Sequence, residues 1–257
     1  MYIDTHAHLY LDQFNDDIDE VLSTAKENKV QKIFLPNIDS STTQSMFALC
    51  KAYPGVCYPM MGLHPCSVKE NFKEELSHIK EKKNSQRIYG VGETGIDLYW
   101  DKTTKEIQIE SFNQQIEWAI EWELPIIIHS RDAQDLTIDL IKNMKHEKLT
   151  GIFHCFTGTI EQAEEIVDLN FLMGVGGVAT FKNGGMDRTI PDLDLAHLVL
   201  ETDSPYLAPK PHRGKRNQSS YIPLVANRIA ELKGIPIMEV METTTKNALN
   251  LFRIENK

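Results

Sequence analysis

Short apolar runs alternate with amphipathic stretches along the whole chain. In the longer stretches, apolar residues recur at helical spacing, as in Ile18, Val21 and Ala25 after the acidic start at 15–17. The short runs predict eight strands, over residues 1–10, 30–36, 56–61, 88–92, 125–128, 151–153, 171–175 and 198–201. The longer stretches predict helices from about residue 15 and over 41–52, 68–82, 104–122, 133–144, 160–168, 221–233 and 238–252. A glycine-rich segment at 174–185 is predicted to be irregular.

The alternation of strands and helices predicts the fold class. Strands that are apolar throughout are buried on both faces, and intervening helices imply a parallel sheet with right-handed crossovers. Eight such units close into a TIM-type (β/α)8 barrel. No repeat or linker divides the sequence, so we expect one α/β barrel domain over residues 1–257. An open doubly wound sheet is the alternative, but no Gly-x-Gly-x-x-Gly follows the first strand.

Composition narrows the class of function. The net charge of −10 and the pI of about 5.4 exclude a protein that coats nucleic acid through a broad basic face, although an enzyme could still grip it locally. The four cysteines lack Cys-x-x-Cys spacing, which predicts reduced thiols rather than a disulfide framework. Neither an export signal nor an apolar run long enough to span a membrane is recognisable. We therefore expect a soluble cytoplasmic protein without membrane association.

Two histidines end the first predicted strand, in Asp4-Thr5-His6-Ala7-His8. Because side chains in a strand alternate between its faces, His6 and His8 point the same way. Two imidazoles aimed at one point suit a divalent metal, although two unrelated histidines would give the same short motif. Asp4 lies on the same face, where it could orient an imidazole or make only a core hydrogen bond.

Ionisable residues also end most of the other predicted strands. In a barrel of this class the active site lies at the carboxyl ends of the strands. Unrelated core histidines would fall at any height along strands and helices, so the regular placement favours a functional cluster. The residues at the strand ends are His6, His8, His64, Glu93, His129, His154 and Asp203.

The number of these side chains suggests two divalent metals, because one catalytic zinc takes about three protein ligands. Glu93 can bridge two ions through its two oxygens. Two ions about 4 Å apart can generate hydroxide and clamp both reacting oxygens of a phosphodiester, so hydrolysis is expected, with Asp203 in reach of the attacking water's proton. Imidazole favours zinc, whereas carboxylates and phosphate chemistry admit magnesium or manganese. We divide the remaining ligands into His6, His8 and Asp203 on one ion, and His129 and His154 on the other.

Six segments, in order along the chain, resemble the TatD family of metal-dependent deoxyribonucleases. They are 3–8 (IDTHAH), 62–65 (GLHP), 92–97 (GETGID), 129–133 (HSRDA), 153–158 (FHCFTG) and 200–206 (LETDSPY). The resemblance implies a barrel related to the amidohydrolases, divalent metals and hydrolysis of DNA, with 3′-5′ exonuclease action as in relatives. It implies His64 as a substrate or catalytic contact beside the metal ligands His6, His8, Glu93, His129, His154 and Asp203.

The loop at 208–217 is similar to the Arg-Gly-Lys-x-Asn signature of the same family. It is basic in a protein of negative net charge, so Arg213 and Lys215 are expected to bind phosphate, with a merely solvated loop as the alternative. Gln218-Ser219 stands where many relatives carry Glu-Pro.

Three further residues are candidate substrate contacts. Arg131 follows His129 closely and could reach a second phosphate, or it could pair with Asp132 or Asp135. Tyr99 and Trp100 could stack on unpaired bases, where each stacked base contributes about 1 to 3 kcal/mol, or they could pack under their own loop.

The sequence thus favours a nuclease that uses two metals to cut single-stranded or frayed DNA. The basic loop and the absence of a lysine at the position of Glu93 favour DNA over small amides, lactones or phosphotriesters, which the same metals could hydrolyse. A binding protein without catalytic activity is a third reading. No protein partner is implied.

Overall fold

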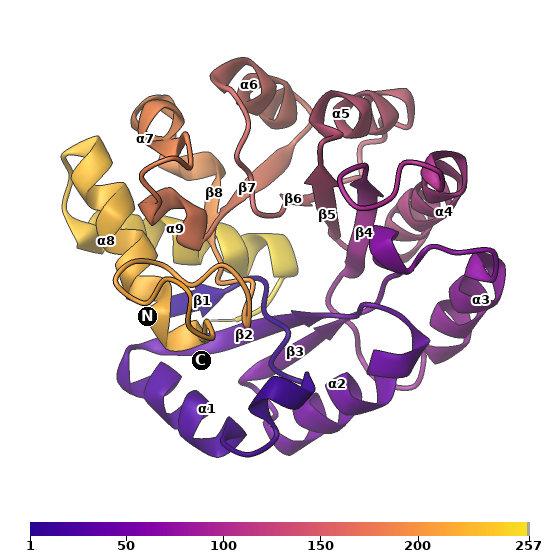
Figure 1. The fold of residues 1–257 in the computed structure, drawn as a ribbon, viewed down its shortest axis with the longest axis horizontal. Helices are drawn as coiled ribbons and strands as arrows, with labels where there is room; N and C mark the ends of the chain where they lie inside the picture. Colours follow the sequence, from indigo (N-terminus) through magenta and orange to yellow (C-terminus); the bar gives the residue numbers. More distant parts are fainter. Residues whose placement is uncertain (256–257) are drawn as a thin grey trace.

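Eight parallel strands form the centre of the computed structural model, which describes residues 1–255 (Figure 1). They lie in the order β1-β2-β3 and β4-β5-β6-β7-β8, and two isolated bridges, Ala7 with Ser204 and Met61 with Val91, close them into a ring. The predicted (β/α)8 barrel is therefore confirmed. The strands are β1 Tyr2–Asp4, β2 Val30–Pro36, β3 Cys57–Met60, β4 Val91–Asp97, β5 Ile126–Arg131, β6 Gly151–Phe153, β7 Phe171–Val175 and β8 Leu198–Leu200.

Most of the helices surround the strands on the outside of the ring (Figure 1). They are α1 Ile18–Glu27, α2 Ser40–Ala52, α3 Phe72–Lys82, α4 Lys105–Trp122, α5 Gln134–Asn143, α6 Ile160–Asp168, α7 Met186–Thr189, α8 Ile222–Lys233 and α9 Ile237–Phe252. Short 3-10 helices lie at Asp12–Phe14, Pro65–Ser67, Gly177–Thr180, Ile190–Asp192, Leu195–His197 and Ser219–Tyr221. Within residues 1–255, no helix is long and apolar enough to cross a membrane.

Side-chain alternation along the strands produces two apolar clusters. In β2, Ile33 and Leu35 pack in the layer shared with the helices, whereas Phe34 belongs to a second cluster inside the barrel. The ring of Phe252, at the end of α9, stacks on Phe34 with 3.6 Å between centroids. Since Thr245 of the same helix donates a hydrogen bond to the carbonyl of Met1, α9 covers the amino-terminal end of the barrel.

Several boundaries differ from those predicted. β1 ends at Asp4, so His6 and His8 lie beyond it. β4 covers Val91–Asp97 instead of 88–92, because its pairing with β5 continues to the carboxyl end of β5. Residues 65–67 form a 3-10 helix, so α3 begins at Phe72. The glycine-rich segment contains one short 3-10 helix, Gly177–Thr180, and α7 follows it. Residues 256–257 of the predicted single domain lie outside the described residues.

Candidate metal centre

The strand ends bring five imidazoles and two carboxylates together at the carboxyl-terminal end of the barrel. Most of them line one pocket of about 490 Å³, and His6 lies fully buried beneath it. The pocket wall also includes Asp97, Trp100 and Arg131. The seven side chains are those predicted from the sequence, namely His6, His8, His64, Glu93, His129, His154 and Asp203.

Glu93 lies at the centre of the cluster, and its two oxygens face different imidazoles. Oε2 is 3.0 Å from His6 Nε2 and 3.4 Å from His8 Nε2. Oε1 is 2.9 Å from His129 Nδ1, 3.3 Å from His64 Nε2 and 3.6 Å from His154 Nε2. A carboxylate with one oxygen toward each set of nitrogens has the arrangement that bridging two cations requires.

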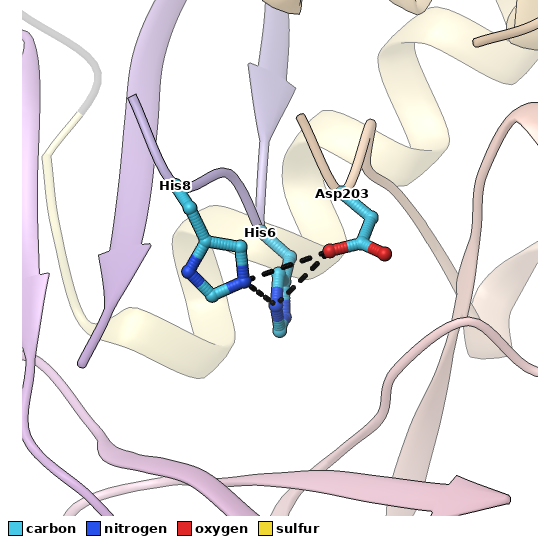
Figure 2. A group of neighbouring side chains, drawn as sticks. All are labelled: His6, His8 and Asp203. Carbon is cyan, nitrogen blue, oxygen red and sulfur yellow. Dashed lines mark hydrogen bonds and ion pairs between the residues drawn. The ribbon is translucent and has the colours of Figure 1, made fainter. Parts of the chain in front are cut away.

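His6, His8 and Asp203 form the group drawn in Figure 2, where both imidazoles and one carboxylate oxygen point toward one another. His6 Nε2 and His8 Nε2 are 3.2 Å apart, and Asp203 Oδ1 is 3.8 Å and 3.6 Å from them. Backbone hydrogen bonds from Asp203 N to the His6 carbonyl (2.9 Å) and from His8 N to the Ser204 carbonyl (2.7 Å) join the ends of β1 and β8. These bonds fix the group although its members are about 200 residues apart in sequence.

The remaining donors lie in two further groups, each of which contains Glu93. Glu93 and His6 group with His154, and Glu93 and His64 group with His129. In the part of the chain that the structure describes, no group of three closely spaced donors contains both His129 and His154, although His129 Nδ1 and His154 Nε2 both face Glu93 Oε1. The assignment of His129 and His154 to one ion stays a prediction.

Two of the candidate ligands are oriented by partners on their outer nitrogens. Tyr10 donates its hydroxyl proton to the carbonyl of Pro36, so it accepts from His8 Nδ1 (2.8 Å). His129 Nε2 lies 2.9 Å from Asp97 Oδ2. A carboxylate at that distance accepts the imidazole proton. When either imidazole is neutral, its proton lies on the outer nitrogen, and the nitrogen that faces the cluster keeps its lone pair for a cation.

Glu201 lies beside the outer nitrogen of His154, as Asp97 lies beside that of His129. Its Oε1 lies 3.0 Å from His154 Nδ1, in an ion pair whose angle falls outside hydrogen-bond geometry, and accepts the backbone N–H of Cys155 (2.7 Å). Gly174 makes room for this buried carboxylate, because a Cβ there would lie 2.1 Å from Glu201 Oε2. The negative charge of Glu201 favours a proton on the outer nitrogen of His154.

The outer nitrogen of His64 accepts a hydrogen bond, whereas the outer nitrogens of His8 and His129 donate one. The backbone N–H of Cys66 donates to His64 Nδ1 (3.0 Å), so that outer nitrogen has no proton. A neutral imidazole then carries its proton on Nε2, which points at Glu93 Oε1. His64 is thus arranged as a hydrogen-bond donor into the pocket rather than as a metal ligand.

Asp4 does not orient an imidazole, which corrects one of the two roles considered from the sequence. Its carboxylate accepts from the backbone N–H (3.0 Å) and hydroxyl (2.6 Å) of Thr202 and from the backbone N–H of His6 (3.3 Å). His6 Nδ1 is buried without a hydrogen-bond partner among residues 1–255. Asp4 therefore joins the ends of β1 and β8 through a core hydrogen-bond network.

The charges of the cluster fit a divalent cation. Burial raises the pKa of Glu93, but His6 and other imidazoles hold it well below its usual value, and the pKa of Asp203 is lowered in the same way. Burial lowers the pKa of His154, but Glu201 and Glu93 together raise it to about 10. Without metal, a protonated imidazole thus offsets the buried carboxylates, and a cation can take over that charge.

The predicted substrate contacts fall into two sets. Arg131 and Trp100 line the pocket, and the Arg131 guanidinium lies 3.9 Å from the ring centroid of Tyr99 and 5.4 Å from that of Trp100. Both rings are exposed, so Tyr99 and Trp100 do not pack under their loop. Arg213 and Lys215 are exposed but do not line this pocket, and Arg213 lies over the ring of Phe181. We therefore find the predicted basic clamp outside the pocket.

Sequence reasoning missed Tyr10, Asp97 and Glu201. Asp97 could have been found, because Glu93 and Asp97 share one face of a strand that continues through the GETGID segment. Glu201 was included in a predicted strand but given no role, although a carboxylate at the end of an apolar run is unusual. Tyr10 carries no comparable signal, since its role depends on the turn after β1.

Comparisons with known proteins identify the family of this chain. The family model described as TatD related DNase matches residues 3–253. The uncharacterized metal-dependent hydrolase YabD of Bacillus subtilis is 41% identical over 255 residues, which cover 99% of this chain and 100% of YabD. The 3′-5′ ssDNA/RNA exonuclease TatD of Pectobacterium carotovorum is 28% identical, covering 98% of this chain and 99% of the relative. The crystal structure of YjjV, a TatD homologue from Escherichia coli, matches with a TM-score of 0.93 and 29% identity over 99% of this chain and 98% of YjjV. The chain is therefore a metal-dependent hydrolase that belongs to the TatD family.

Proposed function

We propose that this hydrolase is a deoxyribonuclease that removes nucleotides from the 3′ ends of single-stranded or frayed DNA. The observation that carries the proposal is the position of Glu93, with one oxygen toward each set of imidazoles, in a pocket that also presents Arg131 and Trp100. A relative of 28% identity is named a 3′-5′ ssDNA/RNA exonuclease, which supports a nucleic-acid substrate.

The donor set would hold two divalent cations, magnesium, manganese or zinc. His6, His8 and Asp203 would bind one ion, His129 and His154 the other, and Glu93 would bridge them. Bound ions would supply a water of lowered pKa and neutralise charge on the phosphodiester. This chain's own part is to fix the donors, through Asp97, Glu201 and Tyr10, before the cations arrive.

Asp203 would accept the proton of the attacking water. Its side chain is 16% exposed, whereas that of Glu93 is 2% exposed, so water in the pocket can reach only the first freely. The lowered pKa of Asp203 keeps it ionised at neutral pH, as a proton acceptor must be.

His64 would act on the substrate rather than on the cations. Its Nε2–H points into the pocket because Cys66 donates to Nδ1, and a phosphate oxygen could replace Glu93 as the acceptor of that proton. A hydrogen bond to developing negative charge in the transition state lowers the barrier.

The substrate strand would run over the rim of the pocket. Arg131 can hold a phosphate by two hydrogen bonds while Tyr99 and Trp100 offer ring faces to unpaired bases. Arg213 and Lys215, outside the pocket, would contact phosphates farther along the strand. The four free cysteines are consistent with a reducing compartment, and we place the activity in the cytoplasm.

A cleavage assay tests the proposal. Purified protein with magnesium or manganese is incubated with a 5′-labelled oligonucleotide, and stepwise shortening that stops on chelation is expected. A matched oligonucleotide whose last linkages are phosphorothioates should resist if digestion starts at the 3′ end. Hydrolysis of lactones, amides or phosphotriesters, with no shortening of DNA in magnesium, manganese or zinc, would assign the site to small molecules instead.

A further inference from the structure

Exposed large apolar side chains gather at the mouth of the metal pocket. Among residues 1–255 there are five of them, and Trp100, Tyr206 and Leu207 line this pocket. Tyr99 packs edge-on against Trp100 with 4.9 Å between ring centroids. The fifth, Met238, lies at the start of α9. A cluster of exposed apolar groups around a polar site marks a surface that a ligand covers.

The cluster forms two walls on opposite sides of the pocket. Tyr99 and Trp100 follow β4, and Tyr206 and Leu207 follow β8. In a closed ring of eight strands, β4 and β8 lie four strands apart in either direction, so their loops face each other across the barrel mouth. The metal-ligand cluster lies between these walls.

The wall after β4 is fixed to the metal centre. Asp97 Oδ1 accepts the backbone N–H groups of Tyr99 (3.0 Å) and Trp100 (3.1 Å), while its other oxygen contacts His129. Arg131 covers the Tyr99 ring from the pocket side of β5. One carboxylate thus positions both a metal ligand and an aromatic wall.

The wall after β8 is held by its backbone, and the Tyr206 ring lies edge-on to His8 with 6.3 Å between ring centroids. The Tyr206 N–H donates to the Asp203 carbonyl (2.8 Å), and the Tyr206 carbonyl accepts from Asn217 Nδ2 (2.7 Å). Leu207 has φ +54°, a left-handed conformation that is unfavourable for a leucine. Its carbonyl packs against Gly177, where a Cβ would lie 2.0 Å away. The loop therefore presents Tyr206 and Leu207 to the pocket at a fixed distance from Asp203.

The two apolar walls and the metal-ligand cluster between them, which forms the floor of the pocket, suit different parts of one ligand. The floor of imidazoles and carboxylates suits cations and a phosphodiester, whereas the walls suit a flat apolar ring. A pocket of about 490 Å³ is within the usual range of roughly 300 to 1,000 Å³ for small-molecule groups. We propose that Tyr206 and Leu207 form, with Trp100 opposite, a subsite for the nucleobase next to the scissile phosphodiester. The inference rests on the proposed nuclease function and makes the base a requirement for rapid cleavage.

The test compares three oligonucleotides of one sequence, of which one is intact, one has an abasic 3′-terminal residue and one has an abasic penultimate residue. Because a stacked base is worth about 1 to 3 kcal/mol, Tyr206→Ala should lower kcat/KM on the intact strand by about 5- to 150-fold. The wild-type protein should cleave one of the abasic strands more slowly than the intact strand. On that strand Tyr206→Ala should lower the rate little further. Tyr206→Phe should retain the wild-type pattern because its ring is kept.

Controls separate this subsite from a general effect. Met238→Ala removes an apolar side chain of similar exposure (50% against 48% for Tyr206) far from the pocket and should change none of the rates. Trp100→Ala should repeat the Tyr206→Ala pattern from the other wall, and it serves if Tyr206→Ala does not fold. Bound metal should be the same in all variants.

An equal loss on all three strands, or no loss on any, would overturn the subsite and leave the nuclease function standing. Failure of the wild-type protein to shorten any of the strands would overturn the nuclease function and the subsite with it.

Discussion

The two ends of the barrel interior are built from the same strands but have opposite chemistry. At the amino-terminal end, Phe34 and Phe252 stack within an apolar cluster that α9 closes. At the carboxyl-terminal end, Glu93 is buried among imidazoles. Burial of the first end stabilises the fold, since each large apolar side chain contributes about 1.5 to 3 kcal/mol. Burial of ionisable groups at the second end costs free energy unless a partner offsets it. The barrel thus separates stability from chemistry along its axis.

Glu93→Gln should give the largest effect on chemistry. Loss of the proposed bridging charge should lower bound metal and reduce hydrolysis by roughly 1,000-fold or more, or about 4 kcal/mol. The free energy of unfolding of the metal-free protein should also fall at neutral pH, because the imidazoles that lower the pKa of Glu93 would lose the carboxylate that offsets their charge. Metal content by mass spectrometry and the rate on DNA are the measurements. Glu164→Gln, on the exposed face of α6, is the matched control. Unchanged metal content would contradict the bridge.

Phe252→Ala should have the converse effect at the other end. Truncation of a phenylalanine that is 3% exposed and stacked on Phe34 should lower the free energy of unfolding by about 3 to 5 kcal/mol. Folded protein should keep its metal affinity, because no donor contacts this side chain. Denaturant unfolding and metal titration measure the two properties. A loss of metal binding with unchanged stability would show that the two ends are not separate.

Asp97→Asn sharpens the comparison within the metal centre. The asparagine amide would direct an N–H toward His129 Nε2, which forces the imidazole proton onto Nδ1, the nitrogen that faces Glu93. Metal affinity should fall about 10- to 100-fold with little change in stability. Isothermal titration of the metal-free protein measures this. Equal affinities in the variant and the wild-type protein would remove Asp97 from its positioning role.

Metal affinity should rise with pH, and this effect should be smaller than those of the substitutions above. Glu201 and Glu93 raise the pKa of His154 to about 10 against the effect of burial, so this imidazole is protonated at pH 7 without metal. A cation must displace that proton, so affinity should rise as the pH rises, by about tenfold per pH unit for one proton. Titrations in buffers of different ionisation enthalpy count the protons released. Affinity that is constant from pH 6 to 8 would show that no such proton is lost.

The barrel could be predicted from the alternation of apolar runs and helical stretches. The donors could be predicted because they follow the apolar runs in sequence. Apolar runs separated by helical stretches gave the strand order, and the residues after those runs included every donor from His6 to Asp203. Strand ends of a barrel meet at one rim, so a one-dimensional pattern was sufficient.

The partners of those donors depend on tertiary contacts, which the spacing of apolar residues along the sequence does not predict. Tyr10 reaches His8 only because the chain turns after β1, and Glu201 reaches His154 from a different strand. The end of β4 was misplaced because its length is set by pairing with β5. The position of Arg213 over Phe181, outside the pocket, likewise follows from how the loop after β8 packs.

Anomalous diffraction from crystals loaded with manganese tests the metal centre most directly. We expect two peaks in the pocket, one among His6, His8 and Asp203 and one beside His129 and His154, with an oxygen of Glu93 toward each. A pocket without a peak, or manganese bound away from Glu93, would contradict the site described here.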